Sequence, residues 1–181
     1  MTQAAPEKRF ELRDGMRPVT FAGELLASAS SQSDSHPSPR WTELAIYKTV
    51  TNKYVLEKIG RSDVYHTTGC TRPGKGALRY ESILHALEDV DPQASLADGD
   101  KYFVPCESCS PSFSSDDPVI VEQDMHSVDS FQTPDDLLAA LYYRKNGAVQ
   151  SLSNLSRNVL EMAGRKDSGI RAVMSKPTDI S

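Results

Sequence analysis

Three cysteines and one histidine carry the strongest chemical signal in the chain. Cys106 and Cys109 form a Cys-x2-Cys pair, and His66 and Cys70 lie upstream of it, so the full spacing is His-x3-Cys-x35-Cys-x2-Cys. The chain has no other cysteine. Thiolate and imidazole groups are preferred ligands of Zn²⁺, and four of them close a structural zinc site. The spacing therefore predicts a structural zinc ion bound by His66, Cys70, Cys106 and Cys109.

Other interpretations of these residues remain open at this point. The cysteines could be buried apolar thiols beside an ordinary histidine, and His85 could replace His66 as the fourth ligand. A Cys70 thiolate next to His66, or a zinc ion with an open coordination position, would instead make the protein an enzyme. No His-Glu-x-x-His pattern, Walker loop or Gly-x-Ser-x-Gly motif accompanies them. We therefore expect a protein that is not an enzyme.

Composition limits the remaining classes. The chain has 181 residues, of which 38% are hydrophobic, so it can bury one core and a second, smaller one. Its formal net charge of −5 disfavours binding to anionic partners in general. Residues 1–10 contain no apolar run of signal-peptide length, and no later run reaches the roughly 18 apolar residues of a membrane span. We expect a cytoplasmic protein with no membrane contact, whose thiols stay reduced and available to a metal.

The apolar pattern predicts an α+β fold in three parts. Residues 1–18 form a mobile arm without a clear period, and residues 19–113 form a β-hairpin with a zinc module. Within the second part, the Ser-rich residues 28–40 form a flexible loop. Residues 114–181 then supply a strand and two helices.

The elements that must position the four ligands follow from local signals. Alternating, β-branched and aromatic residues predict strands at residues 19–27, 41–49, 53–59, 63–65, 101–104 and 119–121. Gly60 is expected to end the hairpin, whose turn is Val50-Thr51-Asn52. Apolar residues at helical spacing predict helices at residues 78–89, from Pro134 to about 146 with Thr133 as N-cap, and from about 153 to 174.

Two stretches around the predicted ligands resemble a known family. Val64-Tyr65-His66-Thr67-Thr68-Gly69-Cys70-Thr71-Arg72-Pro73, followed by a helix and by Tyr102-Phe103-Val104-Pro105-Cys106-Glu107-Ser108-Cys109-Ser110-Pro111, is similar to the Ada-type metal-binding domain. The family pattern has Cys or His, three residues, Cys, a strand and a helix, and then Pro-Cys-x-x-Cys-x-Pro. The resemblance covers residues 61–113 and implies that zinc is held at His66, Cys70, Cys106 and Cys109.

Two departures from the family bear on function. The Ada repair proteins carry, as their first ligand, a cysteine that accepts a methyl group from DNA phosphate, and His66 stands at that position here. Residues 61–113 also hold five Lys and Arg against eight Asp and Glu, a net charge of −3. The resemblance implies a zinc scaffold, and the two departures from the family argue against methyl-phosphotriester repair.

We accordingly expect a regulatory or adaptor protein that binds a protein partner, with self-association through its C-terminal helices as one form. The resemblance alone suggests an accessory protein of a bacterium or phage. A second interpretation is a nucleic-acid-binding module that uses a basic strip of Arg61, Arg72, Lys75 and Arg79. The acidic surroundings of this strip argue against it.

Overall fold

The computed structural model describes residues 8–33, 38–90, 103–109, 114, 116–145 and 148–176. Strands and helices are both present in quantity, which confirms the α+β class. The chain divides into two compact units. Unit 1 consists of Met1–Ser31, Thr42–Ile59 and His126–Ser181, and unit 2 of Gln32–Trp41 and Gly60–Met125. The three expected parts follow one another along the sequence. The two observed units instead interleave, because strands that are distant in sequence pair with each other.

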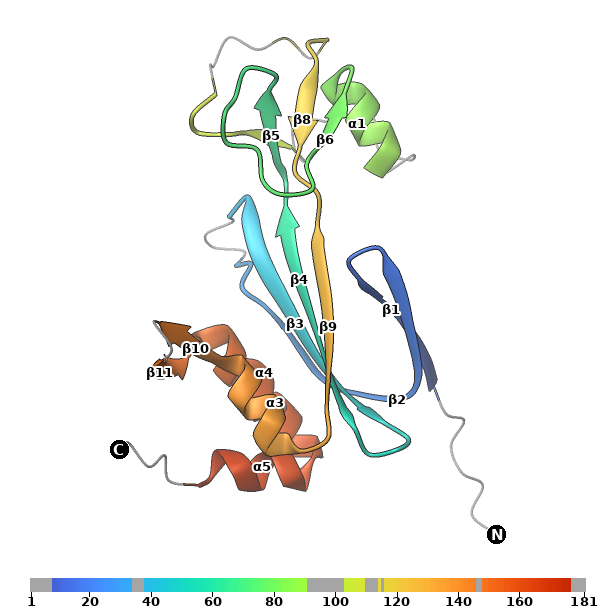
Figure 1. Ribbon diagram of the computed structural model, residues 1–181, viewed down its shortest axis with the longest axis vertical. Helices are drawn as coiled ribbons and strands as arrows, with labels where there is room; N and C mark the ends of the chain where they lie inside the picture. Colours follow the sequence, from blue (N-terminus) through green and yellow to red (C-terminus); the bar gives the residue numbers. More distant parts are fainter. Residues whose placement is uncertain are drawn as a thin grey trace. The chain divides into compact units, whose positions relative to one another are not determined.

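Unit 1 is built on a five-stranded sheet with the strand order β1-β2-β3-β4-β9 (Figure 1). Its strands are β1 (Lys8–Asp14), β2 (Arg17–Ser30), β3 (Arg40–Thr49), β4 (Tyr54–Ser62) and β9 (Met125–Phe131). The expected strand at residues 19–27 lies within β2, and the expected hairpin is β3 and β4. Asn52, in the turn between them, has φ 61°. An Asn at that turn position tolerates the left-handed backbone better than most residues, so the prediction of the hairpin is confirmed.

The expectation of a mobile arm over residues 1–18 was wrong for residues 8–18. Phe10 and Leu12 alternate with charged residues in β1, and β1 pairs antiparallel with β2 through a turn at Gly15, which has φ 58°. Asp14 pairs with Arg17, so Gly15 and Met16 are the two turn residues, and a glycine at the first of them suits a type II′ hairpin turn. Residues 1–7 lie outside the described part of the chain.

The expected loop over residues 28–40 also begins too early. Residues 28–30 continue β2 and pair with β3, with Ser28 opposite Ala45. Ala29 packs against the main core, which fixes this otherwise polar stretch as strand. Gly60 does not end the hairpin, since β4 continues to Ser62. Residues 34–37 lie outside the described part.

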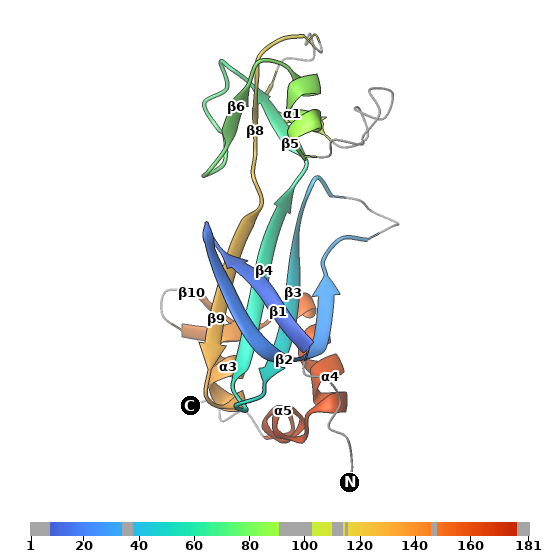
Figure 2. The ribbon, with the colours of Figure 1, turned by 90° about the vertical axis from the view of Figure 1, so that its right-hand side faces the viewer.

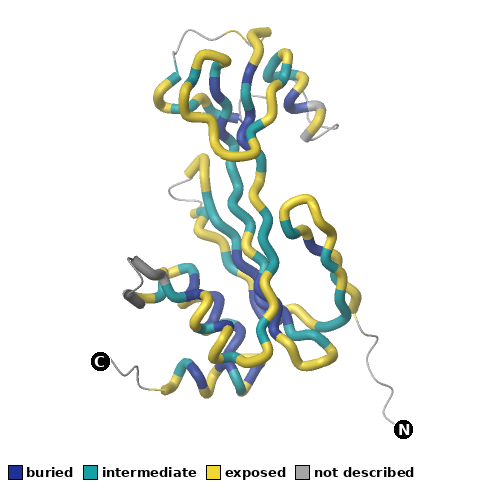
Figure 3. The backbone as a smooth tube through the Cα atoms, in the orientation of Figure 1, coloured by how far each residue is buried: buried dark blue, intermediate teal, exposed yellow. Residues whose placement is uncertain are grey.

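Both faces of the sheet of unit 1 carry apolar clusters. Three helices cover one face, namely α3 (Pro134–Leu141), α4 (Asn154–Lys166) and α5 (Ser168–Met174), and Leu44 and Ile46 of β3 pack against them. The next residues in alternation, Ala45 and Tyr47, belong to a second cluster under the β1–β2 hairpin (Figure 2). Figure 3 shows buried segments along the central strands of this sheet and along its helices.

Residues 142–174 differ from the prediction in two ways. The helix expected from Pro134 to about residue 146 is α3, which stops at Leu141, and β10 (Tyr142–Lys145) pairs with β11 (Ala148–Leu152) in a small hairpin. The expected single last helix is two helices, because Asp167 ends α4 and accepts a hydrogen bond from the N–H of Ile170 as the N-cap of α5. The predicted N-cap at Thr133 is confirmed, since its side chain accepts from the N–H of Asp136.

In its described residues, unit 2 has a four-stranded sheet with the strand order β6-β8-β5-β7 and one helix. These elements are β5 (Val64–Thr67), β6 (Leu78–Tyr80), α1 (Ile83–Val90), β7 (Val104–Pro105) and β8 (Val119–Val121). β5 runs parallel to β7 and antiparallel to β8. Val119 and Val121 pack with Ala86 and Leu87 of α1, so one face of this sheet is covered by the helix.

The strands expected at residues 63–65 and 119–121 correspond to β5 and β8. The helix expected from residue 78 begins only at Ile83, because Leu78–Tyr80 pairs with β8 as β6. Residues 101 and 102 of the expected strand at 101–104 lie outside the described part, Phe103 is not in a strand, and Val104 begins β7. No described helix has the length and apolar character needed to cross a bilayer.

Candidate metal centre

The four predicted ligands meet at one place in unit 2. One ligand atom from each of His66, Cys70, Cys106 and Cys109 lies within 4.8 Å of the others. Sulfur ligands about 2.3 Å from a tetrahedral zinc would lie about 3.8 Å from each other, so the cluster is close to the size that such an ion requires. Among the described residues, this cluster could hold a metal ion.

His66 and Cys70 are placed by β5 and the turn that follows it. His66 pairs with Ile120 of β8 and is 0% exposed. The N–H of Cys70 donates to the carbonyl oxygen of Thr67 at 3.0 Å, which closes a β-turn at the end of the strand. The His66 Nδ1 atom consequently lies 3.3 Å from the sulfur of Cys70.

Cys106 and Cys109 are placed by β7. The N–H of Cys106 donates to the carbonyl oxygen of Tyr65 at 2.9 Å, and the N–H of Cys109 donates to the carbonyl oxygen of Cys106 at 2.9 Å. The first bond continues the pairing of β7 with β5, and the second closes the Cys-x2-Cys turn. A β-turn therefore delivers each half of the cluster, and the two halves meet beside β5.

Backbone groups also contact the sulfur atoms. The N–H of Thr67 donates to the sulfur of Cys109 at 3.4 Å, which joins the two halves of the cluster. Burial alone would raise the pKa of the Cys109 thiol, but the hydrogen bonds from Thr67 and from the neighbouring thiols outweigh it and lower that pKa. A lowered thiol pKa favours the thiolate form, which is the form that binds metal.

His66 has a second partner on the side away from Cys70. Its Nε2 atom lies 2.8 Å from Oε1 of Glu122, a carboxylate that is 9% exposed. Arg40 donates to both carboxylate oxygens, from Nε at 2.8 Å and from Nη2 at 2.7 Å, and Ser62 donates its hydroxyl at 2.7 Å. The Arg40 guanidinium is the main cause that lowers the pKa of Glu122 to about 2, with help from Ser62 and His66 against the effect of burial.

The charge on Glu122 fixes the tautomer of neutral His66. An ionised carboxylate only accepts hydrogen bonds, so Nε2 must carry the proton and donate it to Glu122. Nδ1 then keeps its lone pair, and it is the ring nitrogen that faces Cys70. A carboxylate that orients a histidine from behind in this way is the common partner of metal-binding histidines. The residues present therefore fit a metal ion bound through one imidazole nitrogen and three sulfurs.

Glu122, Arg40 and Ser62 are functional candidates that the sequence did not predict. Glu122 directly follows β8, and its N–H donates to the carbonyl oxygen of Val64, so it continues the pairing of β8 with β5. A polar residue at the end of a strand predicted at residues 119–121 was a signal, but nothing local showed that this strand pairs with the one that carries His66.

The other candidate residues lie elsewhere. His85 is exposed on α1, with its ring 6.1 Å from that of Tyr80, and it is not part of the cluster. Arg61 of the expected basic strip forms an ion pair with Asp124 at 2.6 Å. Arg72, Lys75 and Arg79 are exposed, the first two between β5 and β6 and the third on β6. The Arg61 guanidinium is therefore already paired with a carboxylate, whereas an arginine of a phosphate-binding strip is expected to contact phosphate.

Comparisons of the chain with protein-family models, with curated proteins and with solved structures found no match.

Proposed function

We propose that this protein is a zinc-binding adaptor or regulatory protein with no catalytic activity of its own. His66, Cys70, Cys106 and Cys109 hold one structural Zn²⁺, and the folded surface binds a protein partner. The arrangement that carries the proposal is the convergence of four soft or borderline donors within 4.8 Å, with the carboxylate of Glu122 behind the histidine.

The donor set favours zinc and a closed site. Three sulfurs and one imidazole nitrogen suit Zn²⁺, whereas Mg²⁺ and Ca²⁺ prefer oxygen ligands. Four protein ligands fill a tetrahedron and leave no position for a water molecule or a substrate. This supports a structural role for the ion and argues against both a hydrolytic zinc and a free Cys70 nucleophile.

The resemblance to the Ada-type metal-binding domain is part of the proposal. It is supported by the order of elements between the two ligand pairs, where β6 and then α1 follow Cys70 and β7 leads to Cys106. His66 in place of the first cysteine supports a domain that keeps the metal scaffold without the methyl-accepting thiol.

The class of partner is inferred from charge. The chain has a formal net charge of −5, and the Arg61 guanidinium is paired with Asp124, so a polyanionic partner would meet a mostly acidic protein. We therefore favour a protein partner, including a second copy bound through the C-terminal helices, over a nucleic acid.

Metal analysis of the purified chain tests the zinc site. We expect about one zinc per chain, loss of the metal in Cys106→Ser and in His66→Ala, and a large fall in thermal stability on chelation. Ser108→Ala, in the same turn, is the matched control and should keep the ion. A chain that stays folded with unchanged stability after the metal is removed would contradict the structural role.

Fluorescence-anisotropy titrations with duplex and single-stranded DNA test the class of partner. We expect no binding at about 50 mM salt, where contacts with phosphate are strong. Binding at this salt that weakens on charge reversal of Arg72 and Arg79, with the zinc still bound, would favour the nucleic-acid interpretation and leave the zinc site intact. Sedimentation of the same sample tests self-association directly.

A further inference from the structure

The apolar core of unit 2 is small. In the described residues, its buried apolar cluster has five members, namely Ala86, Leu87, Phe103, Val119 and Val121. The strands of its sheet are two to four residues long, and α1 packs on one face (Figure 1). A core of this size rarely stabilises a fold without a metal ion or a disulfide. The stability of unit 2 therefore depends on the link between its two ligand pairs.

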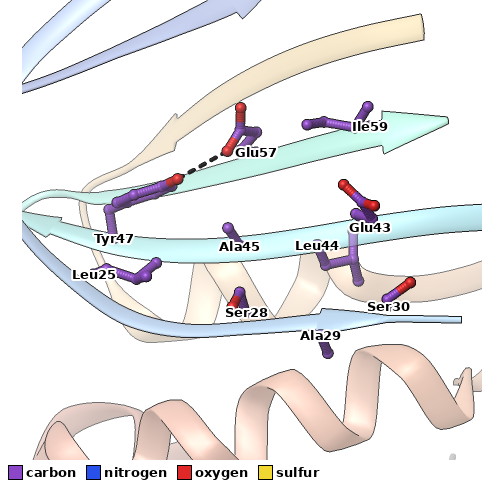
Figure 4. Close-up of a pocket in the computed structure, with 10 residues that line it drawn as sticks. All are labelled: Leu25, Ser28, Ala29, Ser30, Glu43, Leu44, Ala45, Tyr47, Glu57 and Ile59. Atoms are coloured by element: carbon purple, nitrogen blue, oxygen red, sulfur yellow. Dashed lines mark hydrogen bonds between the residues drawn. The ribbon is translucent and has the colours of Figure 1, made fainter. Parts of the chain in front are cut away.

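Unit 1 has stabilising contacts of its own. Its main apolar cluster has twelve buried members, which come from β2, β3, β4 and the helices α3, α4 and α5, and a second cluster lies under the β1–β2 hairpin. Tyr47 of β3 also donates its hydroxyl to Oε2 of Glu57 on β4 at 2.8 Å, beside a cleft of about 390 Å³ (Figure 4). All of these contacts lie within unit 1. Loss of a metal ion from unit 2 should therefore leave unit 1 folded.

The three sulfurs of the cluster are accessible to a small oxidant. Cys70, Cys106 and Cys109 are each half-buried, whereas His66 is 0% exposed. Their ligand atoms lie within 4.8 Å of one another. Exposed cysteine sulfur is the readily oxidised group of a protein, and an oxidised sulfur condenses with a neighbouring thiol to a disulfide. The residues that would hold the zinc ion are thus also open to oxidation.

Cys106 and Cys109 have the geometry that a disulfide requires. The N–H of Cys109 donates to the carbonyl oxygen of Cys106 at 2.9 Å, so the two residues are the first and last of a β-turn. The Cα atoms at the ends of such a turn lie less than about 7 Å apart, and a disulfide needs about 4.4–6.8 Å. The sulfur of Cys70 instead lies 3.3 Å from Nδ1 of His66. We therefore expect Cys106 and Cys109 to pair and Cys70 to remain a thiol.

We propose that the cluster is a redox switch, which rests on the proposed zinc site. Hydrogen peroxide joins Cys106 and Cys109 in a disulfide, the two remaining ligands cannot hold the ion, and unit 2 unfolds while unit 1 keeps its fold. One sulfur attacks an oxygen of the peroxide, the O–O bond breaks, and a sulfenic acid and one water form. The second sulfur displaces the sulfenic oxygen, which leaves as a second water, with protons from the thiols or the solvent. The two cysteines lose the two electrons that the peroxide gains.

Zinc release from the full-length, zinc-loaded protein tests the switch. A chromogenic chelator is chosen that does not remove zinc from the reduced protein. Equimolar peroxide should then release about one zinc per chain and remove about two of the three thiols. Diamide, which takes two electrons and two protons from a pair of thiols without oxidising methionine, should do the same. A protein that holds one zinc and keeps it with either oxidant would overturn the switch alone, whereas a protein that never binds zinc would overturn the proposed function as well.

Peptide mapping identifies the disulfide. Cleavage with trypsin and a glutamate-specific protease places the three cysteines in separate peptides, because Lys101 and Glu107 lie between them. The oxidised protein should contain a disulfide between Cys106 and Cys109, and a thiol reductant with zinc should restore the metal-bound form. A disulfide that includes Cys70, or sulfonic acid without any disulfide, would refute the assignment.

Hydrogen exchange of the oxidised protein tests the effect on the fold. The amides of β5 and β8 should exchange at least about tenfold faster than in the zinc-loaded protein, while residues 42–49 and 54–59 of unit 1 should keep their rates. Ser108→Ala, which keeps all three thiols in place, should respond to peroxide as the wild-type protein does. Unchanged exchange in β5 and β8 after zinc release, or an equal increase in both units, would contradict the inference.

Discussion

Glu122→Gln should weaken metal binding, although Glu122 is not itself one of the four ligands. Each of its oxygens accepts two hydrogen bonds: Oε1 from His66 and from Arg40 Nη2, and Oε2 from Arg40 Nε and from Ser62. A glutamine amide has one oxygen and one NH₂ group in those places. In either orientation the NH₂ group faces an N–H donor of Arg40, so at least one charge-assisted hydrogen bond is lost.

The size of the effect follows from these contacts. A hydrogen bond to a charged group contributes about 1.5–3 kcal/mol, and loss of a carboxylate behind a metal-binding histidine lowers metal affinity about 10- to 100-fold. That range of affinity corresponds to about 1.4–2.7 kcal/mol. We therefore expect Glu122→Gln to bind zinc about 10- to 100-fold more weakly, and Arg40→Gln to show a weaker effect, because the Arg40 side chain is 53% exposed.

Competition for zinc between the protein and a chromogenic chelator measures this affinity at neutral pH. Glu107→Gln is the matched control. Glu107 is an exposed acid in the Cys-x2-Cys turn, so this substitution removes the same charge at a residue that does not contact His66. Ring ¹⁵N shifts should show His66 protonated at Nε2 in the wild-type protein. Equal zinc affinity in Glu122→Gln and Glu107→Gln, or a metal-loaded His66 protonated at Nδ1, would refute the reasoning.

Three further predictions concern the stability of unit 1, measured by denaturant unfolding. Asp167→Asn should cost about 2–4 kcal/mol at neutral pH, because its 4% exposed carboxylate is 2.6 Å from the Lys48 ammonium. Burial opposes the charge on Asp167, but the hydrogen bonds from Lys48 and from the N–H of Ile170 outweigh it and lower the pKa of Asp167. The loss of stability in the variant should therefore be full above about pH 3.9, the unfolded-state pKa, and should vanish as the pH falls through the lower folded-state pKa. A stability difference that does not depend on pH would contradict this. Thr133→Ala should cost about 1 kcal/mol by removing the cap acceptor of α3, whereas Thr133→Ser should cost less, and equal losses would count against the cap. Gly23→Ala should cost about 3 kcal/mol, since its Cβ would lie 2.2 Å from the carbonyl oxygen of Lys48, and wild-type stability would disprove this close approach.

Local signals in the sequence were sufficient where the structure is decided locally. The β3–β4 hairpin depends on strand-forming residues on both sides of Asn52, and the start of α3 depends on Thr133 followed by Pro134. The meeting of His66 with the three cysteines was also predictable, because the chain has only three cysteines and their spacing is typical of a metal site. Each of these features needs few neighbours in space, so its pattern survives in the linear sequence.

Tertiary context decided the features that the sequence analysis missed. Leu78–Tyr80 shares its apolar spacing with the start of a helix, but pairing with β8 makes it a strand. Residues 153–174 have a helical period throughout, yet the Asp167 side chain caps a new helix and bonds to Lys48 and Tyr54, which lie more than 100 positions earlier. Periodicity alone does not contain such contacts.

The position of Glu122 shows how a register can decide chemistry. His66 pairs with Ile120 in the antiparallel ladder of β5 and β8, while Val119 and Val121 pack toward α1. Glu122 follows Ile120 by two positions and therefore lies on the same side as His66. A slip of one residue would turn Glu122 toward α1, put a valine in the place of Ile120, and leave the buried Nε2–H of His66 without this acceptor. The apolar packing of α1 on Val119 and Val121 thus also selects the tautomer of His66 in the candidate metal centre.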